Sequence, residues 1–338
     1  MERLEKGASA PLRLRTLLRH LVPRDGVTPF PTSAQVAPLT SPTQFRYTLE
    51  NDTLTLEQRG FYEDNGYLLI KNLVADEDME RFREEFAKIC RGEVKVPGIV
   101  IMKDVAIAKA APNENTVTKL QDFMCSEELF RYCTLPQIVK YVECFTGPDI
   151  MAMHTMMINK PPDTGKKTSR HPLHQDLHYF AFRPADRVVC AWTAMQQVDQ
   201  RNGCLVVSPG THKGCLKEHK YPDWEGGVNK MYHGITEYDE SLPRVHLPME
   251  KGDTVFFHPL IIHGSGRNRT DGFRKAISCH YASSDCYYID VKGTSQEYLE
   301  KEVAQIAEKR YKIPETLVGL KEAHLIRSRL VKGKRKNL

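Results

Sequence analysis

The chain of 338 residues is 41% hydrophobic and 27% charged, a balance typical of a globular protein with a substantial core. Its longest apolar runs, such as residues 67–70 and 188–192, are far too short to cross a bilayer, so no transmembrane segment is expected. The excess positive charge, a net +5, gathers at the two ends of the chain, which argues against a dedicated nucleic-acid binder with a continuous basic stripe.

Residues 1–29 differ from the rest of the chain. Leucines recur there at helical spacing among arginines, which predicts a basic amphipathic helix. Arg13-Leu14 and, after five residues, His20-Leu21 match the R/K-L-x5-H/Q-L pattern of type-2 peroxisomal targeting signals. We therefore expect a cleavable peroxisomal targeting segment that is bound by the receptor for such signals. A mitochondrial presequence, also basic and amphipathic, is the alternative.

Residues 30–338 are expected to form a single catalytic domain, with helical support over residues 44–149. Thr55 and Gln58 form a T-x-x-Q capping box that predicts a short helix ending near Gly66. Asp76 is a candidate N-cap for a second helix, and a third helical pattern over residues 127–145 is interrupted by a proline. The second helix places four large apolar side chains on one face: Met79, Phe82, Phe86 and Ile89.

From about residue 150 the pattern changes to short strands rich in β-branched and aromatic residues, separated by turn signals. The predicted strands cover residues 151–158, 187–198, 204–208, 253–258 and 273–282. We therefore expect a mainly β protein with flanking helices, in which a jelly-roll core spans about residues 150–285 and a helical region spans 295–338. The nine cysteines include no C-x-x-C pair, which indicates small buried hydrophobes in a reducing compartment.

The segment HPLHQDLHYF, residues 171–180, is the first candidate metal site. In a helix, His171, His174 and His178 would share one face and suggest zinc. In a strand, His174 and Asp176 would share one face and Gln175 would point away. The neighbouring prolines and the strand-like element that follows favour the strand interpretation.

A second candidate segment lies downstream, in VFFHPLIIHGSGRNRTDGFRKAISCHY. Arg274 shares a predicted strand face with small residues, which leaves room for a carboxylate that its guanidinium can hold. His263 is preferred over His258 as the third ligand because small residues follow it and Arg274 is near. We expect His258 and His280 to be hydrogen-bonded histidines of the core or of the surroundings of the metal. Two histidines and one carboxylate on one side of an ion suit non-haem Fe(II).

These motifs resemble the Fe(II)- and 2-oxoglutarate-dependent dioxygenases of the double-stranded β-helix fold. The stretches LTLEQRGFYEDNGYLLIKNLV, KKTSRHPLHQDLHYF and KGDTVFFHPLIIHGSGRN narrow the resemblance to the phytanoyl-CoA hydroxylase branch, from residue 44 to the C-terminus. The resemblance implies that His174, Asp176 and His263 ligate Fe(II). It also implies a 2-oxoglutarate pocket formed by Lys119, Met156, Trp192, Ser265 and Arg274.

The same resemblance implies 2-hydroxylation of a 3-methyl-branched, phytanoyl-type fatty acyl-CoA with O2, with release of succinate and CO2, in the peroxisomal matrix. Ascorbate would restore oxidised iron, and a sterol-carrier-type lipid transfer protein is an expected partner. The aspartate of the H-x-D pair favours hydroxylation, since related halogenases lack it. The alternatives are an Fe(II)/2-oxoglutarate hydroxylase of another small substrate, a zinc enzyme on a similar fold, and a non-catalytic jelly-roll binding protein.

The segment NKPPDTGKKTSR, residues 159–170, leads into the candidate metal segment and is expected to be a loop at the mouth of the pocket. Its cations are predicted to bind the phosphates of CoA: Lys160, Lys166, Lys167 and Arg170.

Overall fold

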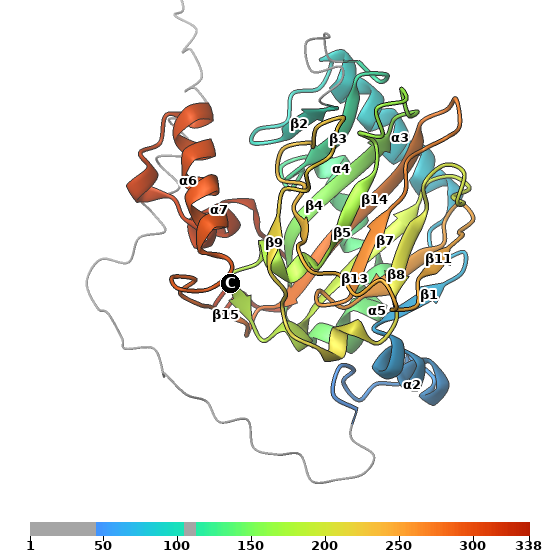
Figure 1. Cartoon of the computed structure of the whole chain (residues 1–338). Coiled ribbons are helices and arrows are strands. Elements are labelled where there is room, and N and C mark those ends of the chain that lie inside the picture. The colour runs from blue at the N-terminus through green and yellow to red at the C-terminus, as the bar shows by residue number, and fades with distance from the viewer. Residues whose placement is uncertain (1–44, 105–112) are drawn as a thin grey trace, which may run out of the picture.

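A computed structural model of the chain describes residues 45–104 and 113–338, without the side chains of residues 310 and 311. The predicted targeting segment therefore lies outside the described residues. Two antiparallel sheets stack on each other (Figure 1). The large sheet contains, in spatial order, β1 (Tyr67–Ile70), β12 (Thr254–Phe257), β7 (Val188–Ala194), β14 (Arg274–Ser283), β4 (Ile150–Lys160), β3 (Val117–Gln121) and β2 (Val100–Lys103).

The small sheet has the order β11 (Val245–Leu247), β8 (Leu205–Ser208), β13 (Ile262–Ser265) and β5 (His171–His174). Two further strand pairs, β9 (His219–Lys220) with β10 (Gly234–Ile235) and β6 (Phe182–Arg183) with β15 (Tyr287–Tyr288), lie in the connections. Apolar side chains of both sheets, among them Val207 and Val255, pack against each other. The predicted mainly β fold with flanking helices is confirmed.

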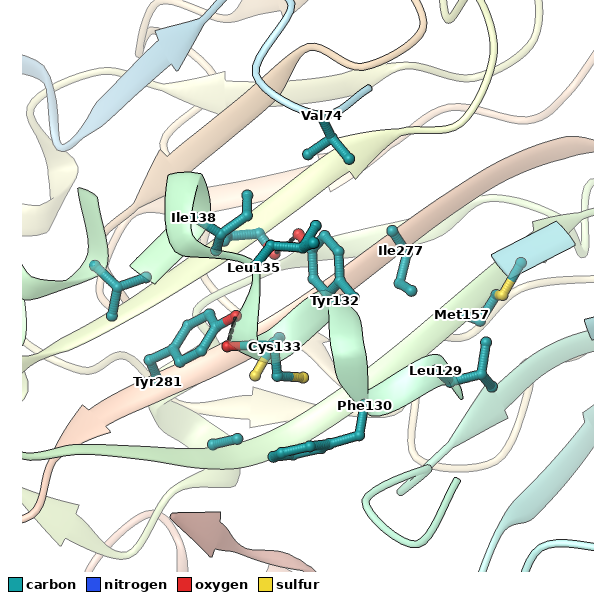
Figure 2. Close-up of a cluster of buried hydrophobic side chains, with 14 of the residues drawn as sticks. Val74, Leu129, Phe130, Tyr132, Cys133, Leu135, Ile138, Met157, Ile277 and Tyr281 are labelled. Carbon is teal, nitrogen blue, oxygen red and sulfur yellow. Dashed lines mark hydrogen bonds between the residues drawn. The ribbon is translucent and has the colours of Figure 1, made fainter. Parts of the chain in front are cut away.

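Three helices pack on the outer face of the large sheet: α3 (Asp76–Arg91), α4 (Glu127–Thr134) and α5 (Pro136–Thr146). The helix α2 (Leu56–Asn65) lies at the end of the sheet and adds Tyr62 to the same buried cluster (Figure 1). Figure 2 shows part of the buried cluster between the helices and the sheet, where Tyr132 and Leu129 of α4 lie near Ile277 of β14. The hydroxyl of Tyr281 donates a hydrogen bond to Cys133 O at 3.2 Å, so even the polar tip of this side chain is satisfied inside the core (Figure 2).

The strand β14 follows the alternation that its sequence predicts. Ile277 and Cys279 belong to the core under the helices, whereas Arg274 and His280 line a pocket on the opposite face. A bulge after His280 shifts the register with β4. One face of this strand therefore supports the fold and the other supplies polar groups to a site between the sheets.

Several local predictions can be compared with the structure. The capping box of Thr55 and Gln58 is present, and Gly66 ends α2 with a φ of 79°. The prediction that Asp76 caps α3 is wrong, because Ala75 is the N-cap and makes no side-chain hydrogen bond. Asp76 instead lies in the first turn, where a carboxylate still interacts favourably with the helix dipole. The strand β2 was not predicted, because glycines and prolines interrupt the sequence of residues 92–112.

The C-terminal region contains the expected helices, α6 (Glu297–Tyr311) and α7 (Leu320–Arg327), which lie together at one side of the sheets (Figure 1). It also contains a strand that was not predicted, β16 (Arg329–Lys332), which pairs with the first part of β4. Within the described residues, no helix is both long and apolar enough to cross a membrane. All nine cysteines are described and are free thiols.

Candidate active site

The three predicted metal ligands converge between the sheets. His174 ends β5, His263 lies opposite it on β13, and Asp176 follows two residues after His174. The Nε2 atoms of His174 and His263 lie 3.2 and 3.7 Å from Asp176 Oδ1. The three ligand atoms all lie within 4.8 Å of one another, and the three residues are buried. This arrangement fits a single ion held on one side by two imidazoles and one carboxylate.

Hydrogen bonds fix the orientation of both imidazoles. The Nδ1 of His174 is 2.9 Å from Pro172 O, and the Nδ1 of His263 is 3.1 Å from Ile261 O. Because a carbonyl oxygen can only accept, both Nδ1 atoms carry the proton, and both Nε2 atoms present a lone pair toward Asp176. The histidines are therefore prepared to ligate a metal.

His280 holds the carboxylate from the other side. Its Nε2 is 2.8 Å from Asp176 Oδ2, which leaves Oδ1 facing the two ligand histidines. Burial alone would raise the pKa of Asp176, but its interactions with the neighbouring imidazoles of His263, His280 and His174 hold it well below its usual value. The carboxyl group is thus ionised and ready to bind a cation. His280, expected to be a hydrogen-bonded histidine of the core or of the surroundings of the metal, makes this hydrogen bond beside the triad.

The local structure of this segment differs from the predicted strand. The strand ends at His174, and Asp176 opens a 3₁₀ turn, Asp176–Tyr179. Gln175 lies between the two ligands as expected but is buried, donating hydrogen bonds from Nε2 to Leu260 O and Cys215 O. The turn brings the carboxylate beside the imidazole of His174, so the ligands are close although the strand interpretation was wrong for Asp176.

A cluster of histidines supports the metal-binding segment from behind. The backbone N–H of Gln175 donates to His219 Nε2 at 2.9 Å, and His178 Nε2 lies 3.1 Å from His233 Nδ1. His233 Nε2 lies 3.1 Å from the carboxylate of Glu302 on α6. Although burial would raise the pKa of Glu302, hydrogen bonds from His233 and other neighbours lower it to about 2. The contacts of His233 with Glu302 and with His178 therefore connect the helix α6 to the metal-binding segment.

Arg274 is buried at the end of the pocket with most of its hydrogen-bonding capacity unused. Its Nη2 donates to Gly203 O at 2.8 Å, whereas Nε and Nη1 have no partner among the described residues. Burial lowers the pKa of Arg274 to about 10, which still leaves it charged near neutral pH. A buried guanidinium with two free donors is costly unless a ligand satisfies it, and a carboxylate matches its fork.

The other residues of the predicted 2-oxoglutarate pocket lie around Arg274. The guanidinium of Arg274 sits 5.3 Å from the ring centroid of Trp192, and Lys119 Nζ lies 4.6 Å from that of Tyr232. These four residues and the metal triad line one pocket. Its lining includes every residue predicted for the metal and for 2-oxoglutarate: Lys119, Met156, His174, Asp176, Trp192, His263, Ser265 and Arg274.

The four cations predicted to bind CoA are not equivalent. Lys166 and Lys167 are exposed on the loop, as expected. The guanidinium of Arg170 stacks 3.5 Å from the ring centroid of Trp224. The loop position predicted for Lys160 is wrong, because Lys160 is the last residue of β4 and is buried in the wall of the pocket. Strand periodicity could have revealed this, since Lys160 shares a face with Met156 and Ile158.

The sequence of the chain also matches a known protein family. The sequence profile of the family described as "Phytanoyl-CoA dioxygenase (PhyH)" matches residues 62–276. The chain belongs to the phytanoyl-CoA dioxygenase family. The resemblance inferred from the sequence motifs is thereby confirmed.

Curated relatives extend the match to nearly the whole chain. The protein of Rattus norvegicus named "Phytanoyl-CoA dioxygenase, peroxisomal" is 67% identical over 331 residues, which cover 96% of this chain and 98% of the relative. The protein of Homo sapiens with the same name is 65% identical over 343 residues and covers all of both chains. A "Probable phytanoyl-CoA dioxygenase" of Caenorhabditis elegans is 56% identical, covering 86% of this chain and 97% of its own.

Solved structures show that this member of the phytanoyl-CoA dioxygenase family shares its fold with SnoN and EctD, two proteins solved with 2-oxoglutarate (alpha ketoglutarate). The epimerase SnoN, solved in complex with Fe3+, alpha ketoglutarate and nogalamycin RO, superposes with a TM-score of 0.55 at 20% identity, covering 72% of this chain and 88% of SnoN. EctD from S. alaskensis, solved with 2-oxoglutarate and 5-hydroxyectoine, gives a TM-score of 0.55 at 13% identity and covers 72% and 82% of the two chains. Both likenesses concern the fold.

Proposed function

We propose that the protein uses Fe(II), 2-oxoglutarate and O2 to hydroxylate carbon 2 of a 3-methyl-branched, phytanoyl-type fatty acyl-CoA, with release of succinate and CO2. The observation that carries the proposal is the pairing, within one buried pocket, of a His-Asp-His triad with an arginine that has two unsatisfied nitrogens. The triad can hold the ion, and Arg274 can hold the distal carboxylate of 2-oxoglutarate. The acyl-CoA assignment follows the names of relatives that match this chain at 65–67% identity.

The residues of the pocket have separate roles in this reaction. His174, Asp176 and His263 would hold the iron, which supplies activation of O2 coupled to oxidative decarboxylation of 2-oxoglutarate. Arg274 and Ser265 bind the far end of the co-substrate and thereby set its orientation. The triad is buried between two sheets, and the surrounding protein therefore excludes bulk water from the reacting groups. The chain thus binds, orients and shields, and the metal carries out the oxidation.

The two other classes of function explain less of the pocket. A zinc enzyme that activates water would use the triad but would leave Nε and Nη1 of Arg274 without a hydrogen-bond acceptor. A jelly-roll binding protein would need neither the paired orientation of the imidazoles nor the ionised Asp176. The proposed oxygenase uses both features.

The remaining parts of the proposal concern the cellular setting. The relatives' names place them in peroxisomes, and the R/K-L-x5-H/Q-L match at Arg13 and His20 supports delivery of this chain to the peroxisomal matrix by the type-2 receptor. Ascorbate would restore iron that has become oxidised without turnover. A sterol-carrier-type protein would present the water-insoluble acyl chain.

The iron site is tested by Asp176→Ala. This change removes the anionic ligand, so bound Fe(II) per chain and succinate formation should both fall to background while the protein stays folded by circular dichroism. His258→Ala is the matched control, because His258 is equally buried but its Nε2 lies 3.5 Å from Asp186 instead of facing the triad. Near wild-type turnover by Asp176→Ala would show that the triad is misassigned.

A further inference from the structure

A second buried cation lies beside Arg274. Lys160 ends β4, and its Cα pairs with that of Arg274 in the β4–β14 register. The ammonium Nζ of Lys160 donates hydrogen bonds to Ser265 Oγ at 2.9 Å, to Gly266 O at 2.8 Å and to Ser169 O at 2.5 Å. These three acceptors occupy all three donors of the ammonium group.

No carboxylate among the described residues lies within ion-pairing distance of Lys160, although its side chain is buried. Burial and the nearby charge of Arg274 hold the pKa of Lys160 well below its usual range. A lysine in this position is unfavourable by itself, because two positive charges share a desolvated region. A ligand with negative charge at this end of the pocket would offset that cost.

The hydrogen bond from Lys160 also determines what Ser265 can do. A hydroxyl has one hydrogen to donate and two lone pairs that accept. Since Ser265 Oγ accepts from an ammonium, its own hydrogen must point to a different group, and among the described residues it has no acceptor. Ser265 lines the same pocket as the unsatisfied nitrogens of Arg274. A ligand that displaces water from the pocket can be this acceptor.

We propose that Lys160 is a positioning residue of the 2-oxoglutarate site, which fixes the hydroxyl of Ser265 as a donor toward the distal carboxylate of the co-substrate. This inference rests on the proposed function and assigns Lys160 to the co-substrate instead of to CoA. The alternative is that Lys160 is only a structural clamp that joins β4 to residues 169 and 266. The two roles differ in which ligand they affect and in whether they act through Ser265.

The test measures binding without turnover, by calorimetric titration of the Fe(II)-loaded protein in the absence of oxygen. The ligands are 2-oxoglutarate and 2-oxobutyrate, which keeps the 2-oxo acid end but lacks the distal carboxylate. Lys160→Met should weaken binding of 2-oxoglutarate about tenfold and leave that of 2-oxobutyrate nearly unchanged. Lys213→Met is the matched control, because Lys213 is exposed and does not line the pocket, and it should change neither affinity.

A double-mutant cycle with Ser265→Ala tests whether Lys160 affects 2-oxoglutarate binding through Ser265. Ser265→Ala alone should also weaken binding of 2-oxoglutarate about tenfold. If Lys160 acts through Ser265, the double variant should lose about ten- to twentyfold in affinity, well short of the roughly hundredfold expected from two independent tenfold effects. Should Lys160→Met not fold, Lys160→Gln, which keeps hydrogen-bond donors without the charge, must show the same selective loss at smaller size.

Equal weakening of both ligands by Lys160→Met, or additive effects in the cycle, would overturn the positioning role, as would unchanged binding of 2-oxoglutarate. Failure of the wild-type protein to bind 2-oxoglutarate would instead overturn the proposed function itself. The wild-type titration therefore separates the two failures.

Discussion

Arg274→Lys is the substitution that isolates recognition of the distal carboxylate. It retains a positive charge in the pocket but removes the planar fork whose Nε and Nη1 are unsatisfied and whose Nη2 is anchored on Gly203 O. A lysine offers a single nitrogen, so it cannot donate two parallel bonds to a carboxylate and also retain the anchor in the same geometry.

The expected loss can be estimated from one charge-assisted hydrogen bond, worth roughly 1.5–3 kcal/mol. This corresponds to a weakening of 2-oxoglutarate binding by about one to two decades. The assay measures KM for 2-oxoglutarate from succinate production, together with the dissociation constant in the absence of oxygen. The KM for the acyl-CoA should change little, because Arg274 lies at the co-substrate end of the pocket.

Arg267→Lys provides the matched control for this experiment. Arg267 makes the same type of charged contact, 3.1 Å from Asp163, but its side chain is 40% exposed and does not line the pocket. Its replacement should leave KM for 2-oxoglutarate at the wild-type value. An unchanged KM and dissociation constant in Arg274→Lys would refute the assignment of this residue to the distal carboxylate.

Three further predictions concern the CoA end, delivery and stability. Lys166→Glu with Lys167→Glu should raise KM for the acyl-CoA several-fold at low salt and leave KM for 2-oxoglutarate unchanged, with a smaller effect as ionic strength rises; wild-type values at low salt would place the CoA site elsewhere. Arg13→Glu with His20→Glu should abolish peroxisomal import in cells, and mitochondrial import of the intact chain would contradict the targeting prediction. Glu302→Gln should lower the free energy of unfolding by on the order of 2 kcal/mol at pH 7. Since the pKa of Glu302 is lowered from 4.5 to about 2, this difference should be full above its unfolded pKa and disappear as pH falls toward about 2; denaturant titrations that show a pH-independent difference would refute it.

The sequence predicted those features of the site that depend on local periodicity. Alternation along β14 placed Arg274 on the opposite face from Ile277, and the structure has this arrangement. The choice of His263 over His258 relied on the glycines and serine after His263, and of the two it is His263 that faces Asp176. Such features follow from side-chain direction, which the strand period determines.

Features that depend on long-range register could not be predicted in the same way. The pairing of Lys160 with Arg274 joins residues more than a hundred positions apart, and without it Lys160 resembled a loop cation. The turn at Asp176 was missed because two prolines near the segment favoured an extended chain, whereas hydrogen bonds from distant residues hold the 3₁₀ turn. Gln175, for example, is fixed by Leu260 O.

The central claim is that 2-oxoglutarate decarboxylation in this pocket is coupled to hydroxylation of a branched acyl-CoA. The most direct measurement follows both products by mass spectrometry after incubation of the purified protein with phytanoyl-CoA, Fe(II), 2-oxoglutarate and 18O2. The account predicts equimolar succinate and 2-hydroxyphytanoyl-CoA, each carrying one 18O atom, and neither product with Asp176→Ala. Succinate without change in the acyl-CoA, or a hydroxylated product that contains oxygen from water only, would contradict the account.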